Sequence, residues 1–128
     1  MRVYHGRGIR KMGGTGGKKR PSHDKLRCHV GGEFTATKVG EKEVRVLKGT
    51  RGGGLKARLK HAAFANVVKE GKVVKAKIRT VLETPDNRHY ARQNIITKGA
   101  IIDTEMGKVK VTNRVGQDGV VNGILMKV

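Results

Sequence analysis

The chain has 128 residues and a formal net charge of +19, from 29 Lys and Arg against 10 Asp and Glu. Because such an excess repels itself in a compact fold, we expect a polyanionic partner that supplies the missing negative charge. No apolar run approaches the roughly 18 residues of a membrane-spanning helix, and we see no signal-peptide core or basic amphipathic helix. The composition favours one small domain that binds nucleic acid and contacts no membrane.

Aromatic side chains are scarce, with two Tyr, two Phe and no Trp. Proteins that hold single strands usually stack bases on aromatic rings, so a stacking platform is not expected here. The partner is therefore predicted to be folded RNA, held by its phosphates and shape. The single cysteine, Cys28, excludes an intrachain disulfide and fits a reducing, cytoplasmic location.

The first part of the chain differs in composition from the rest. Residues 1–29 carry nine basic side chains and one acid, a net charge of +8. They include six glycines, and their few apolar residues follow neither a helical nor a strand period. Such a segment buries too little surface to offset its ordering entropy. We therefore predict a flexible basic arm over residues 1–31, disordered when free and ordered on its partner.

Residues 32–128 are predicted to form a mainly β body, because apolar residues alternate with polar ones and turn signals recur every 8–12 residues. The pattern is typical of a single small β-barrel or sandwich. A hairpin turn is expected at residues 70–72, another at 106–107, and a turn at 117–119 before the last strand. The expected strands cover residues 34–39, 43–48, 55–60, 65–68, 73–82, 101–102, 108–112 and 120–126.

Two local features of the body are predicted in more detail. In the strand over residues 73–82, alternation puts five side chains on one face and Lys75, Lys77 and Arg79 on the other. The five are Val74, Ala76, Ile78, Thr80 and Leu82. A short helix is expected over residues 86–92, after Pro85, with Asp86 as its candidate N-cap.

The glycine-rich run at residues 13–19 does not meet the requirements of a nucleotide-binding loop. That motif needs a Gly where Met12 stands and a Ser or Thr where Lys19 stands. Glycines here instead let backbone N–H groups approach a phosphate closely, or serve as linker joints. For Gly52 and Gly53 we predict a positive φ or a close contact.

Metal binding and catalysis are both disfavoured. His23, Cys28 and His29 lack the four ligands and paired spacings of a structural zinc site. The acidic residues stand mostly beside Lys or Gly in expected strands and turns, and no nucleophile stands in an elbow-like context. We expect no cofactor, no small-molecule substrate and no enzymatic activity.

Basic clusters supply the candidate RNA contacts. One cluster is the arm, the second is a glycine loop that leads into a strand with basic outward positions, and the third is the short helix. A solvated charged face is the alternative for each body cluster. The candidates are Arg7, Arg10, Lys11, Lys18, Lys19, Arg20, Lys25, Arg27, Lys48, Arg51, Lys56, Arg58, Lys60, Arg88, His89, Tyr90 and Arg92.

Several motifs occur in a familiar order: Thr-Gly-Gly-Lys at residues 15–18, Arg-Gly-Gly at 51–53, Ala-Asn-Val at 65–67, and the long blocks 83–100, 112–114 and 116–122. With them the chain resembles the archaeal and eukaryotic small-subunit ribosomal protein eight family, which is unrelated to the bacterial protein of that number. The resemblance implies a β-barrel-like body in an archaeal small (30S) ribosomal subunit. It also implies contacts to small-subunit ribosomal RNA and to neighbouring ribosomal proteins, without homo-oligomers.

The leading hypothesis is thus a structural ribosomal protein that supports translation. The second is a free RNA chaperone or single-strand binder on a β-barrel, which should depend on Tyr90 or Phe64. The third is a nucleotide-dependent enzyme, which should lose nucleotide binding on Lys18→Ala. The three differ in whether folded RNA, unstructured RNA or nucleotide is bound.

Overall fold

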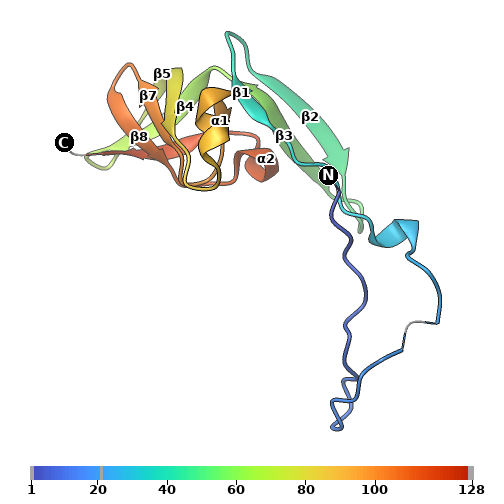
Figure 1. Cartoon of the computed structure of the whole chain (residues 1–128). Coiled ribbons are helices and arrows are strands. Elements are labelled where there is room, and N and C mark those ends of the chain that lie inside the picture. Colours follow the sequence, from blue (N-terminus) through green and yellow to red (C-terminus); the bar gives the residue numbers. More distant parts are fainter. Residues whose placement is uncertain (1, 21, 127–128) are drawn as a thin grey trace. The chain divides into compact units, whose positions relative to one another are not determined.

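A computed structural model of the chain describes residues 2–20 and 22–126. The chain divides into two compact units, Met1–Phe34 and Thr35–Val128. The first unit is largely extended and has one turn of 3-10 helix, η1 (Arg27–His29). The second unit contains the strands and α-helices, and its architecture confirms the mainly β prediction (Figure 1).

Five strands of the second unit form a closed barrel in the order β4-β5-β7-β8-β9. Its neighbours are antiparallel except at the closure, where β9 pairs with β4 in parallel and Asn66 is aligned with Asn122. The barrel, rather than the sandwich, is therefore the observed alternative. The bounds are β4 (Phe64–Lys69), β5 (Lys72–Glu83), β7 (Ile101–Thr104), β8 (Gly107–Val111) and β9 (Asn122–Leu125).

A second sheet has the order β2-β3-β1-β6, so β2 is an edge strand. It contains β1 (Thr37–Val39), β2 (Val44–Gly49), β3 (Leu55–Ala62) and β6 (Ile95–Ile96). Two short helices complete this unit: α1 (Arg88–Arg92), which contacts β5 and β6, and α2 (Val115–Asp118), which contacts β3.

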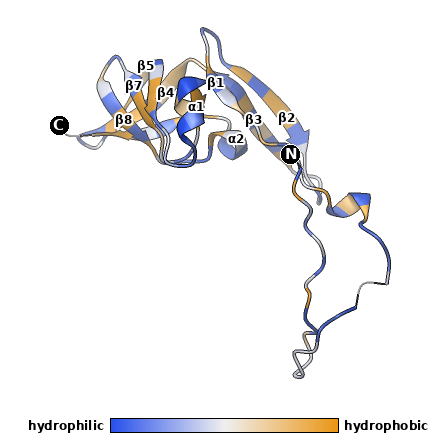
Figure 2. Cartoon of the chain, in the orientation of Figure 1, coloured by the Kyte–Doolittle hydropathy of each residue, from blue (hydrophilic) through white to orange (hydrophobic). Residues whose placement is uncertain are grey.

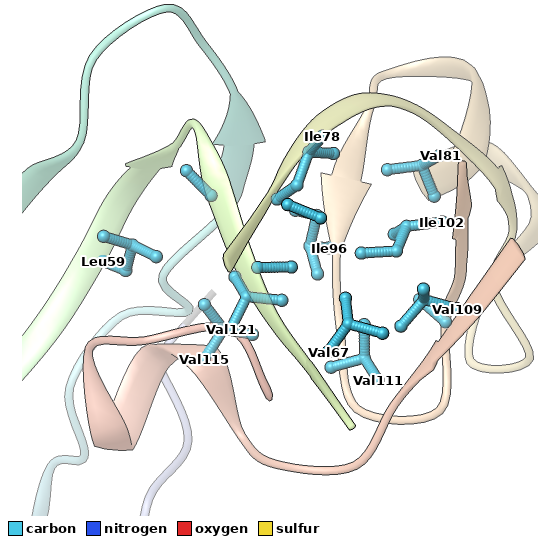
Figure 3. Close-up of a cluster of buried hydrophobic side chains, with 14 residues drawn as sticks. Leu59, Val67, Ile78, Val81, Ile96, Ile102, Val109, Val111, Val115 and Val121 are labelled. Atoms are coloured by element: carbon cyan, nitrogen blue, oxygen red, sulfur yellow. The ribbon is translucent and has the colours of Figure 1, made fainter. Parts of the chain in front are cut away.

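One apolar core lies inside the barrel and continues under β3 and α2 (Figure 3). Its largest members are almost fully buried, and each fully buried Val, Leu or Ile stabilises the fold by roughly 1.5–3 kcal/mol. In Figure 2, which is coloured by hydropathy, apolar residues lie along the strands of the body. The side chains labelled in Figure 3 are Leu59, Val67, Ile78, Val81, Ile96, Ile102, Val109, Val111, Val115 and Val121.

Both predicted hairpins are confirmed. Between β4 and β5, Glu70 (φ 49°) and Gly71 (φ 79°) are left-handed, as the two central residues of a type I′ turn must be. Between β7 and β8, Thr104 Oγ1 donates to the Gly107 carbonyl at 2.9 Å, and the left-handed Gly107 (φ 116°) lets the chain reverse.

The predicted inward face of β5 is correct only over the middle of the strand. Ala76 and Ile78 are buried, but further along Val81 is buried while Thr80 and Leu82 are exposed. The pairing with β7 shifts between Ile78 and Thr80 and again between Val81 and Glu83. A bulge inserts an extra residue and so reverses which face the following side chains take, an irregularity that strict alternation does not foresee.

The helix predictions also need correction. The N-cap of α1 is Asn87, not Asp86, because the Asn87 side chain accepts a hydrogen bond from the His89 N–H at 2.9 Å. Of the residues predicted as a turn at 117–119, Gln117 and Asp118 belong to α2, and the left-handed Gly119 (φ 71°) is its C-cap. A Cβ at Gly119 would lie 2.8 Å from the Ala57 Cβ, so this contact with β3 requires glycine.

Strand ends differ modestly from the predicted ones. Residues 34–36 precede β1, and residues 120–121 precede β9. The two-residue strand β6 was not predicted, because two consecutive isoleucines show no alternation. Both are buried and pair with Thr37 and Lys38 of β1.

Candidate nucleic-acid interface

The eight arm residues predicted to contact RNA are all exposed in the first unit: Arg7, Arg10, Lys11, Lys18, Lys19, Arg20, Lys25 and Arg27. Within residues 2–20 and 22–34, Arg2 Nε lies 3.0 Å from Glu33 Oε1, an ion pair that involves none of these eight residues. Residues 2–20 contain no Asp or Glu. This part of the arm therefore carries positive charge with no acid of its own, although Arg2 is paired with Glu33.

Backbone pairing brings four of these basic residues together at the arm tip. Arg10 and Lys18 form an antiparallel bridge. On either side of it, the Lys11 N–H donates to the Gly17 carbonyl at 2.8 Å and the Lys19 N–H donates to the Ile9 carbonyl at 2.7 Å. We call Arg10, Lys11, Lys18 and Lys19 the tip cluster. Like charges placed across a ladder destabilise it, so the tip cluster favours a bound polyanion.

Glycine conformation explains how the chain reverses at the tip. Gly14 (φ 53°) and Gly16 (φ 60°) are both left-handed, and a Cβ at either position would meet nothing within 4 Å. Their role is thus backbone freedom and not close packing. The glycines that lack the spacing of a nucleotide loop instead form the bend that joins Arg10–Lys11 to Lys18–Lys19.

The base of the arm is organised by Tyr4, which the sequence analysis did not single out. Tyr4 is half-buried; its hydroxyl lies 3.2 Å from His29 Nδ1 and accepts a hydrogen bond from the Leu26 N–H at 3.3 Å. The ring stands edge-on to the His29 ring at 5.8 Å between centroids, and Lys25 Nζ lies 5.5 Å from the Tyr4 ring centroid. The sequence did contain a signal for this contact, because Tyr4 is a single aromatic residue in a basic segment without a hydrophobic core.

In the second unit, the β2–β3 hairpin contains the predicted glycine loop. Gly52 (φ 88°) and Gly53 (φ 82°) are both left-handed, which confirms the predicted positive φ. The Thr50 N–H donates to the Gly54 carbonyl at 2.7 Å and closes the loop, and Arg51 is exposed within it. The loop therefore needs glycine for its backbone shape, since a Cβ at Gly52 or Gly53 would be in open space.

The basic residues predicted as contacts in β2 and β3 lie on one face of the hairpin, but they are not equally accessible. Lys48 is paired directly with Lys56, and both are exposed. Lys56 Nζ donates to Gln117 Oε1 of α2 at 2.9 Å. Arg58 is half-buried and its Nη1 donates to Thr35 Oγ1 at 3.3 Å, whereas Lys60 is exposed. The hairpin thus presents Lys48, Lys56 and Lys60 outward and holds part of Arg58 within the body.

Helix α1 carries the last predicted cluster. Arg88 and Arg92 are exposed and four residues apart, so they lie on the same face of the helix. His89 is exposed as well, whereas Tyr90 is half-buried. A surface cleft at the start of α1 is lined by residues 82–89 and Ala91, including the carboxylates of Glu83 and Asp86. These acids make α1 a more mixed surface than the tip cluster.

One arginine outside the predicted set has a structural role. Arg45 Nε donates to the Gly119 carbonyl at 2.7 Å, and its Nη2 lies 2.6 Å from Glu43 Oε2. It therefore ties β2 to the end of α2 and has its charge balanced locally.

The two histidines considered for a metal site contact different partners, and the cysteine is exposed. His23 Nδ1 lies 2.8 Å from the Asp24 carbonyl oxygen, His29 contacts Tyr4, and Cys28 is exposed. Across residues 2–20 and 22–126, no three His, Cys, Asp or Glu side chains are grouped as a metal site would require. Within the same residues, no helix has the length and apolar character needed to cross a membrane.

Together these features define a small β-barrel protein whose basic side chains gather in clusters suited to a polyanion. The model of the ribosomal protein S8e family matches residues 4–126, and the chain belongs to this family. The resemblance inferred from the motifs is thereby confirmed.

Similar proteins agree along almost the whole chain. The protein from Hyperthermus butylicus named small ribosomal subunit protein eS8 is 49% identical over 99% of this chain and 94% of its own length. The proteins of the same name from Staphylothermus marinus and Sulfolobus acidocaldarius are 49% and 43% identical, each over 99% of both chains. The family is one of ribosomal proteins and is not known for enzymes, so the chain is assigned a non-enzymatic role.

Proposed function

We propose that this protein is a structural constituent of an archaeal small (30S) ribosomal subunit in the cytoplasm. There it binds and stabilises folded small-subunit ribosomal RNA through phosphate contacts and so supports translation. Family membership and the names of the archaeal relatives support the ribosomal role. The distribution of charge and the scarcity of aromatics support the phosphate contacts.

The tip cluster is the observation that carries the proposal. Backbone hydrogen bonds hold four basic residues together within residues 2–20, where no acid occurs. A narrow, extended segment of this kind can enter a gap between RNA helices that a globular body cannot enter. Inside such a gap it neutralises phosphates that repel one another.

The body contributes further contacts in this proposal. The exposed Lys48–Lys56 pair places two positive charges directly opposite each other, and a phosphate bound between them would relieve their repulsion. Arg88 and Arg92 present a second pair at helical spacing. Arg51 extends the hairpin surface at a loop whose glycines leave the backbone open to approach.

The proposal is tested by the salt dependence of binding to folded small-subunit ribosomal RNA. If roughly 6–10 phosphates are neutralised, affinity should fall about 10³–10⁵-fold between 50 and 200 mM salt. Filter binding or fluorescence anisotropy over this range measures the slope. A salt response near zero would contradict phosphate binding.

A second measurement separates this role from that of a free single-strand binder. If the protein has the proposed ribosomal role, it prefers folded RNA over an unstructured oligonucleotide. Deletion of residues 1–31 then removes most of its affinity for folded RNA. A single-strand binder would instead prefer the oligonucleotide and lose binding on Tyr90→Ala or Phe64→Ala. Co-sedimentation with small subunits through a moderate-salt wash checks the ribosomal location directly.

A further inference from the structure

A row of three apolar side chains crosses the outside of the barrel. Val68 of β4 is paired with Val73 of β5 and aligned with Ile124 of β9, so the three lie side by side on adjacent strands. Their exposed fractions are 40% for Val68, 67% for Val73 and 55% for Ile124. We call Val68, Val73 and Ile124 the outer apolar row.

Strand alternation fixes the direction of this row. Val67 and Gly123, which neighbour Val68 and Ile124 in sequence, are buried toward the core, so the row residues point away from it. Single exposed apolar side chains are ordinary on a protein surface. Three at paired positions on three adjacent strands form a contiguous apolar patch, and contiguous patches, unlike single residues, are a feature of interaction surfaces.

Positive and polar side chains border the outer apolar row. Lys75 lies two residues from Val73 on the same face, and Lys110 of β8 is paired with Ile124. Lys75 Nζ lies 4.5 Å from the Phe64 ring centroid, and Asn66 Nδ2 donates to Asn122 Oδ1 at 3.1 Å. Strands β4 and β9 contain no Asp or Glu, and the one acid of β5 is Glu83 at its far end. The turn that joins β4 to β5 holds one acid, Glu70, between Lys69 and Lys72.

The chemistry of the row decides which kind of partner fits. Bases stack on aromatic rings, and phosphates bind cations, but branched aliphatic side chains do neither. Burial of Val68, Val73 and Ile124 is favourable only against another apolar surface. Because the barrel is closed, its strands offer no free edge to which a partner could add a strand. The contact must therefore be made by side chains.

We propose that the outer apolar row docks a neighbouring protein of the small ribosomal subunit, whose contacting segment presents apolar side chains flanked by Asp or Glu. The carboxylates pair with Lys75 and Lys110, which border the row. This inference rests on the proposed ribosomal function. It adds a protein-binding face to a molecule whose other clusters are suited to RNA.

The direct test places a photo-reactive diazirine side chain at Val73 or at Ile124 of the full-length protein, within purified small subunits. Illumination and mass spectrometry then identify what is crosslinked. The expected product joins the probe to a peptide of one other ribosomal protein, rich in apolar and acidic residues. The matched control carries the same probe at Leu82, which is 45% exposed at the other end of β5. The control should not give that product.

A pair of substitutions tests the energetic contribution. Val73→Ser with Ile124→Ser removes apolar surface without changing charge, and we expect about ten-fold weaker competition with the unmodified protein for incorporation into subunits. Affinity for isolated ribosomal RNA should match that of Leu82→Ser, and thermal unfolding confirms that both variants fold. Crosslinks to ribosomal RNA alone, to no protein, or to a peptide without carboxylates would overturn the inference. Failure of the unmodified protein to join subunits would instead overturn the proposed function and this inference with it.

Discussion

The arm and the barrel both carry excess positive charge, but they differ in what orders them. The arm has no buried apolar cluster among its described residues, and its order comes from a few backbone hydrogen bonds and the contacts of Tyr4. The barrel has a continuous apolar core, and its positive charge is confined to outward positions. The residues that form the core and the basic residues of the arm are therefore different sets, and we expect that folding and the proposed polyanion binding can be altered independently.

The largest expected effect comes from the tip cluster. Replacing Arg10, Lys11, Lys18 and Lys19 together by Gln should lower affinity for folded ribosomal RNA by about 10³-fold at 0.1 M salt and reduce the salt slope by roughly 3–4. The thermal midpoint of the body should not change, because no core residue is touched. Binding titrations at several salt concentrations measure both quantities.

The control for that variant has the same charge change placed elsewhere. It replaces four exposed lysines of the body that are outside the predicted contacts by Gln: Lys42, Lys69, Lys72 and Lys98. An equal loss of affinity in the two variants would show that total charge matters and the tip does not.

The next largest effect concerns the barrel alone. Ile102→Ala removes a fully buried side chain at the centre of β7 and should lower the free energy of unfolding by about 3 kcal/mol. Under conditions where the variant remains folded, its salt slope for RNA binding should equal that of the unmodified protein. Denaturant unfolding and binding titrations test the two halves of the statement, and a changed slope would mean that the barrel and RNA binding are coupled.

A smaller loss of stability is expected for Gly119→Ala, by about 2 kcal/mol. The substitution puts a side chain at φ 71° and a Cβ against the Ala57 Cβ at 2.8 Å. The matched control is Gly52→Ala, with a similar φ of 88° but open space around the new Cβ, which should cost about 1 kcal/mol. Equal losses by chemical denaturation would indicate that the contact between α2 and β3 contributes nothing.

The smallest predicted effect lies at the base of the arm. Tyr4→Phe keeps the ring but removes the hydroxyl that contacts His29 and the Leu26 N–H, a change of about 1 kcal/mol. Faster amide exchange should be confined to the arm, with the thermal midpoint of the body unchanged. Hydrogen exchange read by NMR measures this, and exchange that rises in the barrel would contradict the separation of the two units.

Local patterns predicted much of the body. Alternating residues indicated most strands, and residues 70–72 indicated the hairpin between β4 and β5, because these signals arise from residues adjacent in sequence. Alternation failed where the β5 bulge changes the side-chain phase after Ile78. It also could not reveal β6 or the parallel closure between β4 and β9, which depend on partners distant in sequence.

The candidate site was predictable in composition but not in arrangement. Charge and glycine content distinguished residues 1–31 from the body, but the flexible arm stays a prediction. The pairing of Arg10 with Lys18 and the contact of Tyr4 with His29 depend on how the backbone reverses direction. The half-burial of Arg58 was not predicted, because its hydrogen-bond partner Thr35 is uncharged and distant in sequence. The individual RNA contacts and the boundary at residue 31 remain predictions.

The parallel pairing of β4 with β9 has a consequence for the order of events during synthesis. The barrel closes when β4 pairs with β9, and in this pairing Val68 is aligned with Ile124, 56 residues later in the chain. Until then β4, β5, β7 and β8 can form only an open antiparallel sheet, whose inward side chains are not yet enclosed. A nascent chain at that stage already displays the arm and its charge. The RNA contacts proposed for the arm are therefore available before the core is complete, and the barrel closes only once β9 has been synthesised.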